Sequence, residues 1–196
     1  MSWSLGETAA LALKATRGAG LSWGLAEEAA GAVFWLHQRG LPGISALCGY
    51  LESCGVATTD DDAACPLVLG TALSDGTHAV PEQVGGRIDL GTVKAPLLLL
   101  PFVATIPPGT FWLIAPGDGD AAPDQWHSGW LRGSAPCQLR RGTAAQMAGT
   151  RVGQTRLPDQ FACCVDRLTG YAHRTYAPAT SQSRLAGAGA GLTDND

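Results

Sequence analysis

The feature that most constrains the fold is a long apolar segment in the middle of the chain. No Asp, Glu, Lys or Arg occurs between Lys94 and Asp118, and an uncharged run of this length is nominally long enough to cross a bilayer. The run nevertheless contains five prolines, and each proline removes a backbone donor and interrupts a helix. We therefore predict that the segment is buried protein core and expect no membrane partner.

Two apolar stretches within this run, residues 97–106 and 111–115, flank the sequence Pro107-Pro108-Gly109-Thr110. Pro108 fixes φ at the first corner of a turn, and Gly109 accepts the positive φ that a type II turn requires at the second corner. Both stretches are apolar on both faces. The pattern therefore predicts a β-hairpin at the centre of a sheet that is covered on both sides.

The first third of the chain has helical periodicity instead. Ser4 followed by Glu7 is the pattern of a capping box, and Gly18 is placed to end the helix that begins there. Ser22 is the expected cap of a second helix, and a third is predicted to end near Gly55. We therefore expect three helices before the apolar segment begins.

The rest of the chain divides into strand-like and helix-like parts. Short apolar runs bounded by turn residues predict strands at residues 66–73 and 137–141, and helical spacing returns after residue 158. We predict an α+β fold, with an N-terminal three-helix segment packed on a mostly antiparallel central sheet, a C-terminal helix and an ordered Gly-rich tail. The expected organisation is one domain over residues 1–196, divided into a helical part (1–55), mainly strands (56–157), a helix (158–177) and the Gly-rich tail (178–196).

The charge content is low, and its distribution is uneven. Charged residues make up 15% of the chain, against roughly 25% in typical soluble domains, so we expect part of the surface to be covered by another copy in a homo-oligomer. Nine acidic residues face two basic ones in residues 56–131, whereas eight arginines face two acids in residues 132–184. This cationic part suits carboxylate or phosphate ligands, although its docking on the acidic part is the simpler interpretation.

The N-terminal sequence and the cysteines indicate an intracellular protein. The N-terminal sequence Met-Ser-Trp-Ser-Leu-Gly-Glu lacks the basic start and the apolar run of a secretory signal. A cytoplasmic location is therefore expected, and the six cysteines are expected to be thiols rather than disulfides.

Several function classes lack their sequence signatures. The first 55 residues carry more acidic than basic side chains, which disfavours nucleic-acid binding. The four histidines have no metal-ligand spacing, so no metal is expected. The glycines of Gly18-Ala-Gly20-Leu-Ser-Trp-Gly24 resemble a dinucleotide fingerprint, but a helix rather than a strand precedes them. No cofactor or catalytic residue can be assigned, and whether the protein is an enzyme stays open.

Segments at both ends of the chain resemble a family of small bacterial proteins of unknown function. One is Arg-Gly-Ala-Gly-x-x-Trp-Gly, which begins at Arg17, and the other is Gly-Ala-Gly-Ala-Gly-Leu-Thr-Asp-Asn-Asp, which ends at Asp196. The resemblance implies a bacterial cytosolic protein and supplies no catalytic residues.

The functional hypothesis is a site for a small anionic metabolite, with or without turnover. Ser22 and the free amides at the start of the second helix can hold an anion beside Arg17, although capping alone also explains Ser22. The tail is expected to pack near that helix start, so that an arginine from each segment reaches one ligand. The alternative is a non-catalytic assembly or regulatory subunit that acts through protein–protein contacts. The expected ligand-binding residues are Arg17, Ser22, Trp23, Glu27, Tyr176, Thr180, Ser183 and Arg184.

Overall fold

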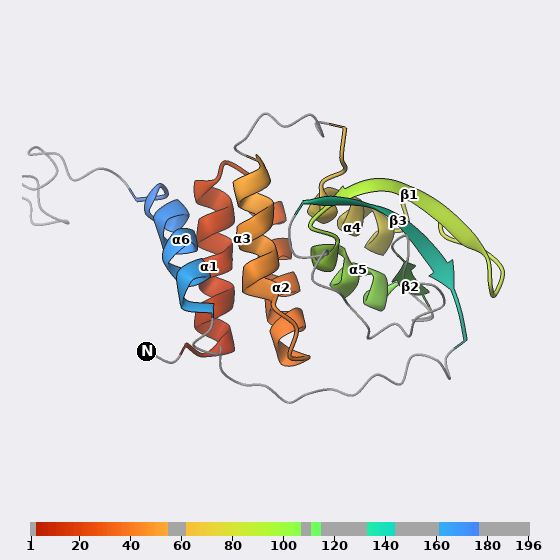
Figure 1. Ribbon diagram of the computed structural model, residues 1–196, viewed down its shortest axis with the longest axis horizontal. Helices are drawn as coiled ribbons and strands as arrows, with labels where there is room; N and C mark the ends of the chain where they lie inside the picture. The colour runs from red at the N-terminus through yellow and green to blue at the C-terminus, as the bar shows by residue number, and fades with distance from the viewer. Residues whose placement is uncertain (1–2, 55–61, 107–110, 115–132, 144–160, 177–196) are drawn as a thin grey trace, which may run out of the picture.

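The computed structural model describes residues 3–54, 62–106, 111–114, 133–143 and 161–176. Its helices and antiparallel strands confirm the α+β class (Figure 1). The elements in chain order are α1 (Leu5–Gly18), α2 (Trp23–Gln38), α3 (Gly43–Cys54), α4 (Pro66–Ser74), β1 (Arg87–Lys94), the 3₁₀ helix η1 (Pro96–Leu99), α5 (Leu100–Thr105), β2 (Phe111–Ile114), β3 (Ser134–Arg141) and α6 (Ala162–His173).

The first two helices begin where the sequence predicts. The backbone amide of Glu7 donates to Ser4 Oγ over 3.2 Å, and the amide of Ser4 donates to Glu7 Oε2 over 2.8 Å. This reciprocal pair is the predicted capping box. At α2 the amide of Leu25 donates to Ser22 Oγ over 3.3 Å, so the predicted cap is confirmed there as well.

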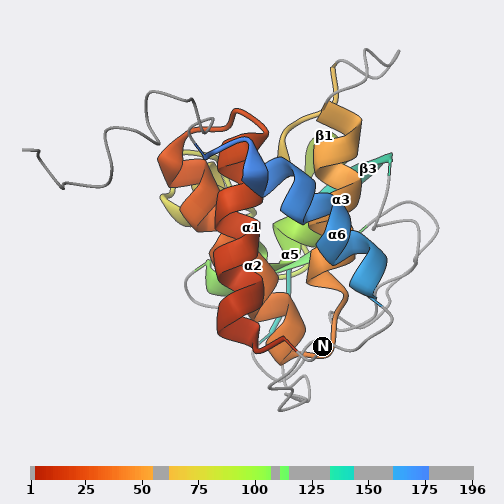
Figure 2. The ribbon, with the colours of Figure 1, turned by 90° about the vertical axis from the view of Figure 1, so that its left-hand side faces the viewer.

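Helix α6 crosses α1 at very close range. Figure 2 shows α6 lying across α1, and a Cβ atom at Gly18 would lie only 1.9 Å from the carbonyl oxygen of Tyr171. Only glycine fits at that crossing point, because the two backbones meet there directly. Gly18 is also the last residue of α1, as predicted, so one glycine both ends this helix and sets how closely the first and the last described helices approach.

Two predicted strands are wrong, because both segments are helical. Residues 66–73 lie in α4, and residues 97–106 form η1 and α5. Pro66, Pro96 and Pro101 each occupy the first turn of one of these helices, where a missing amide hydrogen costs nothing. A short run that is apolar on both faces fits a buried helix as well as a buried strand.

The predicted hairpin is also wrong. Its first arm is helical, and its second arm, β2, pairs instead with β3. The turn residues 107–110 lie outside the described residues. The described sheet has the order β1-β3-β2 with antiparallel pairing throughout. Strand β3 contains the predicted strand at residues 137–141, and it lies in the middle of the sheet.

The register of the three strands aligns apolar side chains on the side of the sheet that faces the protein interior. Leu139 of β3 is directly opposite Ile88 of β1 and Leu113 of β2, and both Leu113 and Leu139 are buried. Strand β1 contains a bulge between Asp89 and Gly91, and Gly91 has a φ of 71°, which glycine adopts without strain.

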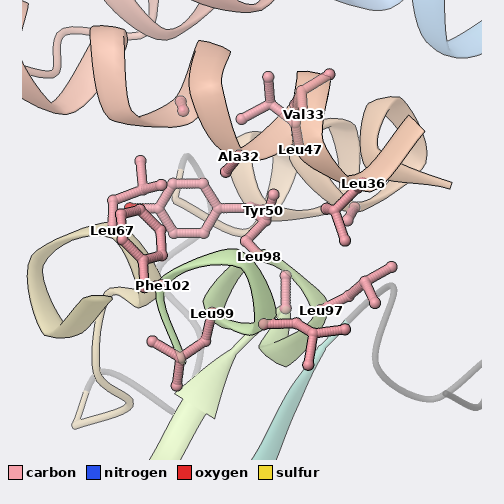
Figure 3. Packing of buried hydrophobic residues seen from close by; sticks show 14 of the residues in the cluster. Ala32, Val33, Leu36, Leu47, Tyr50, Leu67, Leu97, Leu98, Leu99 and Phe102 are labelled. Carbon is pink, nitrogen blue, oxygen red and sulfur yellow. The ribbon is translucent and has the colours of Figure 1, made fainter. Parts of the chain in front are cut away.

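The apolar centre of the molecule comes from η1 and its neighbours. Leu97, Leu98 and Leu99 are all fully buried, which confirms the predicted burial of this segment although it is not a strand. Figure 3 shows these leucines lying between Leu36 on one side and the strands on the other. Elements α4, η1 and α5 therefore form an apolar layer between the N-terminal helices and the sheet (Figure 1).

The C-terminal helix is present as α6, whose buried side chains are Cys164, Val165, Leu168 and Ala172. Residues 177–196, which contain the predicted ordered tail, lie outside the described part of the chain. Among the described residues, none of the helices combines the length and the apolar character that crossing a membrane requires.

Candidate ligand-binding site

The connection between α1 and α2 carries the first group of candidate residues. The guanidinium of Arg17 donates a hydrogen bond to the carbonyl oxygen of Leu21, and Ser22 caps α2 as described. Gly20 has a φ of 99°, which allows the chain to reverse within this short connection. Arg17 and Ser22 thus lie at the two ends of one short connection.

Trp23 adds an aromatic surface to this turn. The Arg17 guanidinium carbon lies 4.8 Å from the centre of the Trp23 ring, and Trp23 is 62% exposed. The first turn of α2 contains no acidic side chain, so the partial positive charge of its free amides is not neutralised within that turn. Glu27 is exposed one turn further along the helix.

Tyr176, which follows α6 near the C-terminal end of the described chain, contacts the second half of α1. The Nζ atom of Lys14 lies 6.0 Å from the centre of the Tyr176 ring, which is 58% exposed. Lys14 and Arg17 are three residues apart on α1, so they share one face of its last two turns. The crossing of α1 by α6 therefore brings Tyr176 to Lys14, which lies one turn before Arg17 on α1.

Lys14 was missed by the sequence reasoning. Its position one turn before Arg17 on a predicted helix could have suggested a role, but its pairing with Tyr176 depends on the helix crossing. Thr180, Ser183 and Arg184 lie outside the described residues. Their approach to Arg17 therefore stays a prediction.

The geometry provides binding groups of two kinds. Two cations, Lys14 and Arg17, each lie over an exposed aromatic ring. A guanidinium carries five N–H donors, so Arg17 retains donors beyond the one that holds Leu21. Each pair thus offers a positive charge beside a ring surface.

His37 is a second notable residue, and it has a structural role. It is 1% exposed, its Nε2 accepts a 3.0 Å hydrogen bond from the amide of Ile44, and its ring meets Phe161 edge-on. Burial lowers the pKa of His37 from 6.5 to about 4. The imidazole is therefore neutral at pH 7, and it caps the start of α3 instead of carrying charge.

The contact between α3 and α6 contains thiols and one ion pair. Cys164 Sγ lies 3.6 Å from Ser45 Oγ, and Arg167 pairs with Glu52 over 2.5 Å. Burial, together with nearby Cys164 and Glu52, raises the pKa of Cys48 to about 12. That thiol stays protonated at neutral pH and is a poor nucleophile. Within the described ranges, no three His, Cys, Asp or Glu side chains are grouped in a way that would hold a metal ion.

The N-terminal half of the site lies in a segment that matches a known family. Residues 3–78 match the family model "Protein of unknown function (DUF3726)". This match agrees with the expected resemblance to a family of unknown function, and it contains Lys14, Arg17, Ser22 and Trp23 but not Tyr176. No curated protein and no solved structure matches the chain.

Proposed function

We propose that this protein binds a small anionic molecule where α2 begins, beside the last two turns of α1. The observation that carries the proposal is the pairing of Lys14 with Tyr176 and of Arg17 with Trp23 on one face of α1. The ligand contacts the cations and the free amides of α2, and its flat or apolar part lies on the exposed rings.

Positive charge at this position is supported from three sources. Lys14 and Arg17 supply two full charges, and the start of α2 adds a partial charge through its unpaired amides. Glu27 lies beyond the first turn of α2, where it limits the net charge and can accept a hydrogen bond from a ligand hydroxyl. Thr180, Ser183 and Arg184 of the tail complete the proposed site as further hydrogen-bond donors to the same anion.

The opposite end of α2 offers a matched control. The guanidinium carbon of Arg39 lies 3.6 Å from the centre of the Trp35 ring, so the same two residue types are stacked there. That pair lies at the C-terminal end of α2, where the helix dipole repels anions. Arg39→Gln removes the same charge as Arg17→Gln from a position that does not bind the ligand.

The test is native mass spectrometry of the freshly purified protein, followed by calorimetric titration with inorganic phosphate, pyrophosphate and citrate. Loss of a charge-assisted hydrogen bond costs about 1.5–3 kcal/mol, so Arg17→Gln is expected to weaken binding about 10- to 100-fold. Arg39→Gln is expected to leave the affinity unchanged. Equal losses in the two variants, or no binding of any of these anions by the wild type, would refute the proposal.

Helix α2 also favours a second candidate function, that of a cytoplasmic bacterial assembly subunit. Trp23 and Phe34 are 62% and 37% exposed, and their separation of eleven residues places them on one side of the helix, three turns apart. This side of α2 is the proposed contact between copies in a homo-oligomer. Light scattering of the wild type and of Phe34→Glu tests it, because a charge in the contact would shift a dimer to monomer.

A further inference from the structure

A second cluster of reactive side chains lies where α3 ends and α4 begins. The hydroxyl of Tyr50 and the sulfur of Cys65 are 2.9 Å apart. Cys65 is the N-cap residue of α4, but its side chain does not cap the helix. Figure 3 shows Tyr50 reaching from α3 towards Leu67 in the first turn of α4. The ring of Tyr50 is therefore directed at the end of the neighbouring helix where Cys65 lies.

A second thiol lies beside Tyr50 on α3. Cys54 follows Tyr50 by four residues on α3, so the two side chains are neighbours on one face of the helix. Burial raises the pKa of Tyr50, and hydrogen bonding to Cys65 and Cys54 raises it further. The phenol oxygen thus contacts the Cys65 thiol directly, and the Cys54 thiol lies one helical turn from Tyr50 on the same face of α3.

The two thiols differ in exposure, and the phenol stays protonated. Cys54 is exposed and Cys65 is half-buried, whereas Tyr50 is only 3% exposed. An exposed thiol is the natural first target of an oxidant, and a second thiol nearby is the usual resolving group. Tyr50, whose pKa is raised by burial, keeps its proton at neutral pH, and a departing hydroxide is basic enough to take that proton.

We propose that Cys54, Cys65 and Tyr50 form a peroxide-responsive site at which the two cysteines are joined in a reversible disulfide. The sulfur of Cys54 attacks hydrogen peroxide, the O–O bond breaks, and Cys54 sulfenic acid and one water are formed. The sulfur of Cys65 then attacks the sulfur of Cys54. The S–O bond breaks as the S–S bond forms, and the departing oxygen leaves as a second water.

Protons and electrons balance in this sequence. Tyr50 gives its proton to the departing oxygen and takes the proton of the Cys65 thiol, so the phenol is regenerated. The two sulfurs supply the two electrons that reduce the peroxide, and the net products are one disulfide and two waters. A dithiol or glutathione-type reductant restores the thiols by exchange.

The other cysteines provide internal controls. Cys48, Cys137 and Cys164 are buried, and Cys163 is exposed on α6. The sulfur atoms of Cys163 and Cys164 are 4.0 Å apart, but the two cysteines are consecutive residues of one helix. A ring closed between consecutive helical residues would distort the backbone of α6, so we expect no disulfide there. Cys163→Ser therefore removes an exposed thiol without touching the proposed site.

The experiment exposes the full-length protein to hydrogen peroxide, blocks the remaining thiols by alkylation and maps the cross-linked peptides by mass spectrometry. The expected product is an intramolecular Cys54–Cys65 cross-link that a reductant reverses. Cys163→Ser should form it at the wild-type rate. Tyr50→Phe should form it about tenfold or more slowly, since a positioned proton donor typically contributes at least that much.

Thermal unfolding of each variant before oxidation provides a check on folding. Closing the loop between residues 54 and 65 should raise the wild-type Tm after oxidation, because a cross-link restricts the unfolded chain. The proposal is overturned if Cys54 and Cys65 are oxidised separately without a cross-link, or if the disulfides formed are intermolecular. A wild-type rate in a folded Tyr50→Phe variant would remove Tyr50 from the mechanism.

Discussion

The helical layer, made of α1, α2, α3 and α6, can be compared with the leucine layer, made of α4, η1 and α5. Among the described residues, the buried polar side chains are Thr8, Thr16 and His37, and all three lie on α1 or α2. The leucine layer buries Leu67, Leu73 and Leu97 to Leu100 together with Phe102 and Val103. The Thr8 hydroxyl donates to the carbonyl oxygen of Ser4 and the His37 ring accepts from the amide of Ile44. The helical layer therefore adds directional contacts and close backbone approach to its apolar burial, whereas the leucine layer relies on apolar area.

This difference teaches what each layer tolerates. Apolar burial is non-directional and scales with the area removed from water, so the leucine layer should accept changes of shape but not of polarity. A hydrogen bond or a close helix crossing depends on position, so the helical layer should respond to single atoms. Three substitutions or conditions can sharpen or break this comparison.

The largest effect is expected in the leucine layer. Leu99 is fully buried, and Leu99→Asp would place an unpaired charge in the apolar interior, which should prevent folding. Leu99→Ala keeps the site apolar and should cost about 2–5 kcal/mol of unfolding free energy. Circular dichroism and urea unfolding measure both variants. A Leu99→Asp protein with wild-type melting behaviour would contradict the assignment of this layer as the core.

A smaller loss of stability is expected when the pH is lowered, and it should arise from His37 in the helical layer. The folded-state pKa of His37 is about 4, below its ordinary value of 6.5. The unfolded state therefore binds the proton first as pH falls. Stability is fully present above pH 6.5 and declines by about 3 kcal/mol as pH approaches 4.

The matched variant for this prediction is His37→Gln, which does not titrate but keeps a side-chain acceptor. Urea unfolding at a series of pH values compares it with the wild type. The advantage of the wild type at pH 7 should shrink steadily towards pH 4. A constant difference across that range would show that His37 is not the group responsible.

The smallest effect of the three is expected at the crossing of α1 and α6. Gly18→Ala would bring a methyl group to 1.9 Å from the Tyr171 carbonyl oxygen, so α6 must shift at a cost of about 1–3 kcal/mol. Gly31→Ala is the control. It lies within α2 with nothing inside 4 Å of its Cβ, and it should stabilise by about 0.5–1 kcal/mol. Thermal unfolding measures both variants: Tm should fall in Gly18→Ala and rise in Gly31→Ala.

The helical layer was more predictable from sequence than the leucine layer. Ser4, Glu7 and Ser22 fix helix starts through contacts within four residues, so the pattern contains the whole interaction. In the leucine layer the secondary structure depends on what covers each face, and a continuous apolar run carries no period that separates helix from strand. Pro96 and Pro101 were interpreted as helix breakers, although a proline equally well begins a helix.

Strand β1 and the candidate site also contain features that local sequence patterns do not reveal. Four of the eight residues of β1 are exposed, and the strand contains the bulge at Gly91, so it lacks the apolar run that indicates a strand. Arg17, Ser22 and Trp23 lie at one helix-to-helix connection because they are close together in sequence. The contact of Lys14 with Tyr176 arises only from the crossing of α6 over α1, and sequence spacing does not encode that crossing.

The close crossing at Gly18 also bears on how the chain is made. The two backbones that meet there, at residues 18 and 171, belong to the first and last described helices. Contacts between residues so distant in sequence must await a large loop closure. During synthesis, α1, α2 and α3 therefore emerge with the side of α1 that receives α6 uncovered, and that side is open to chaperones until α6 has been translated.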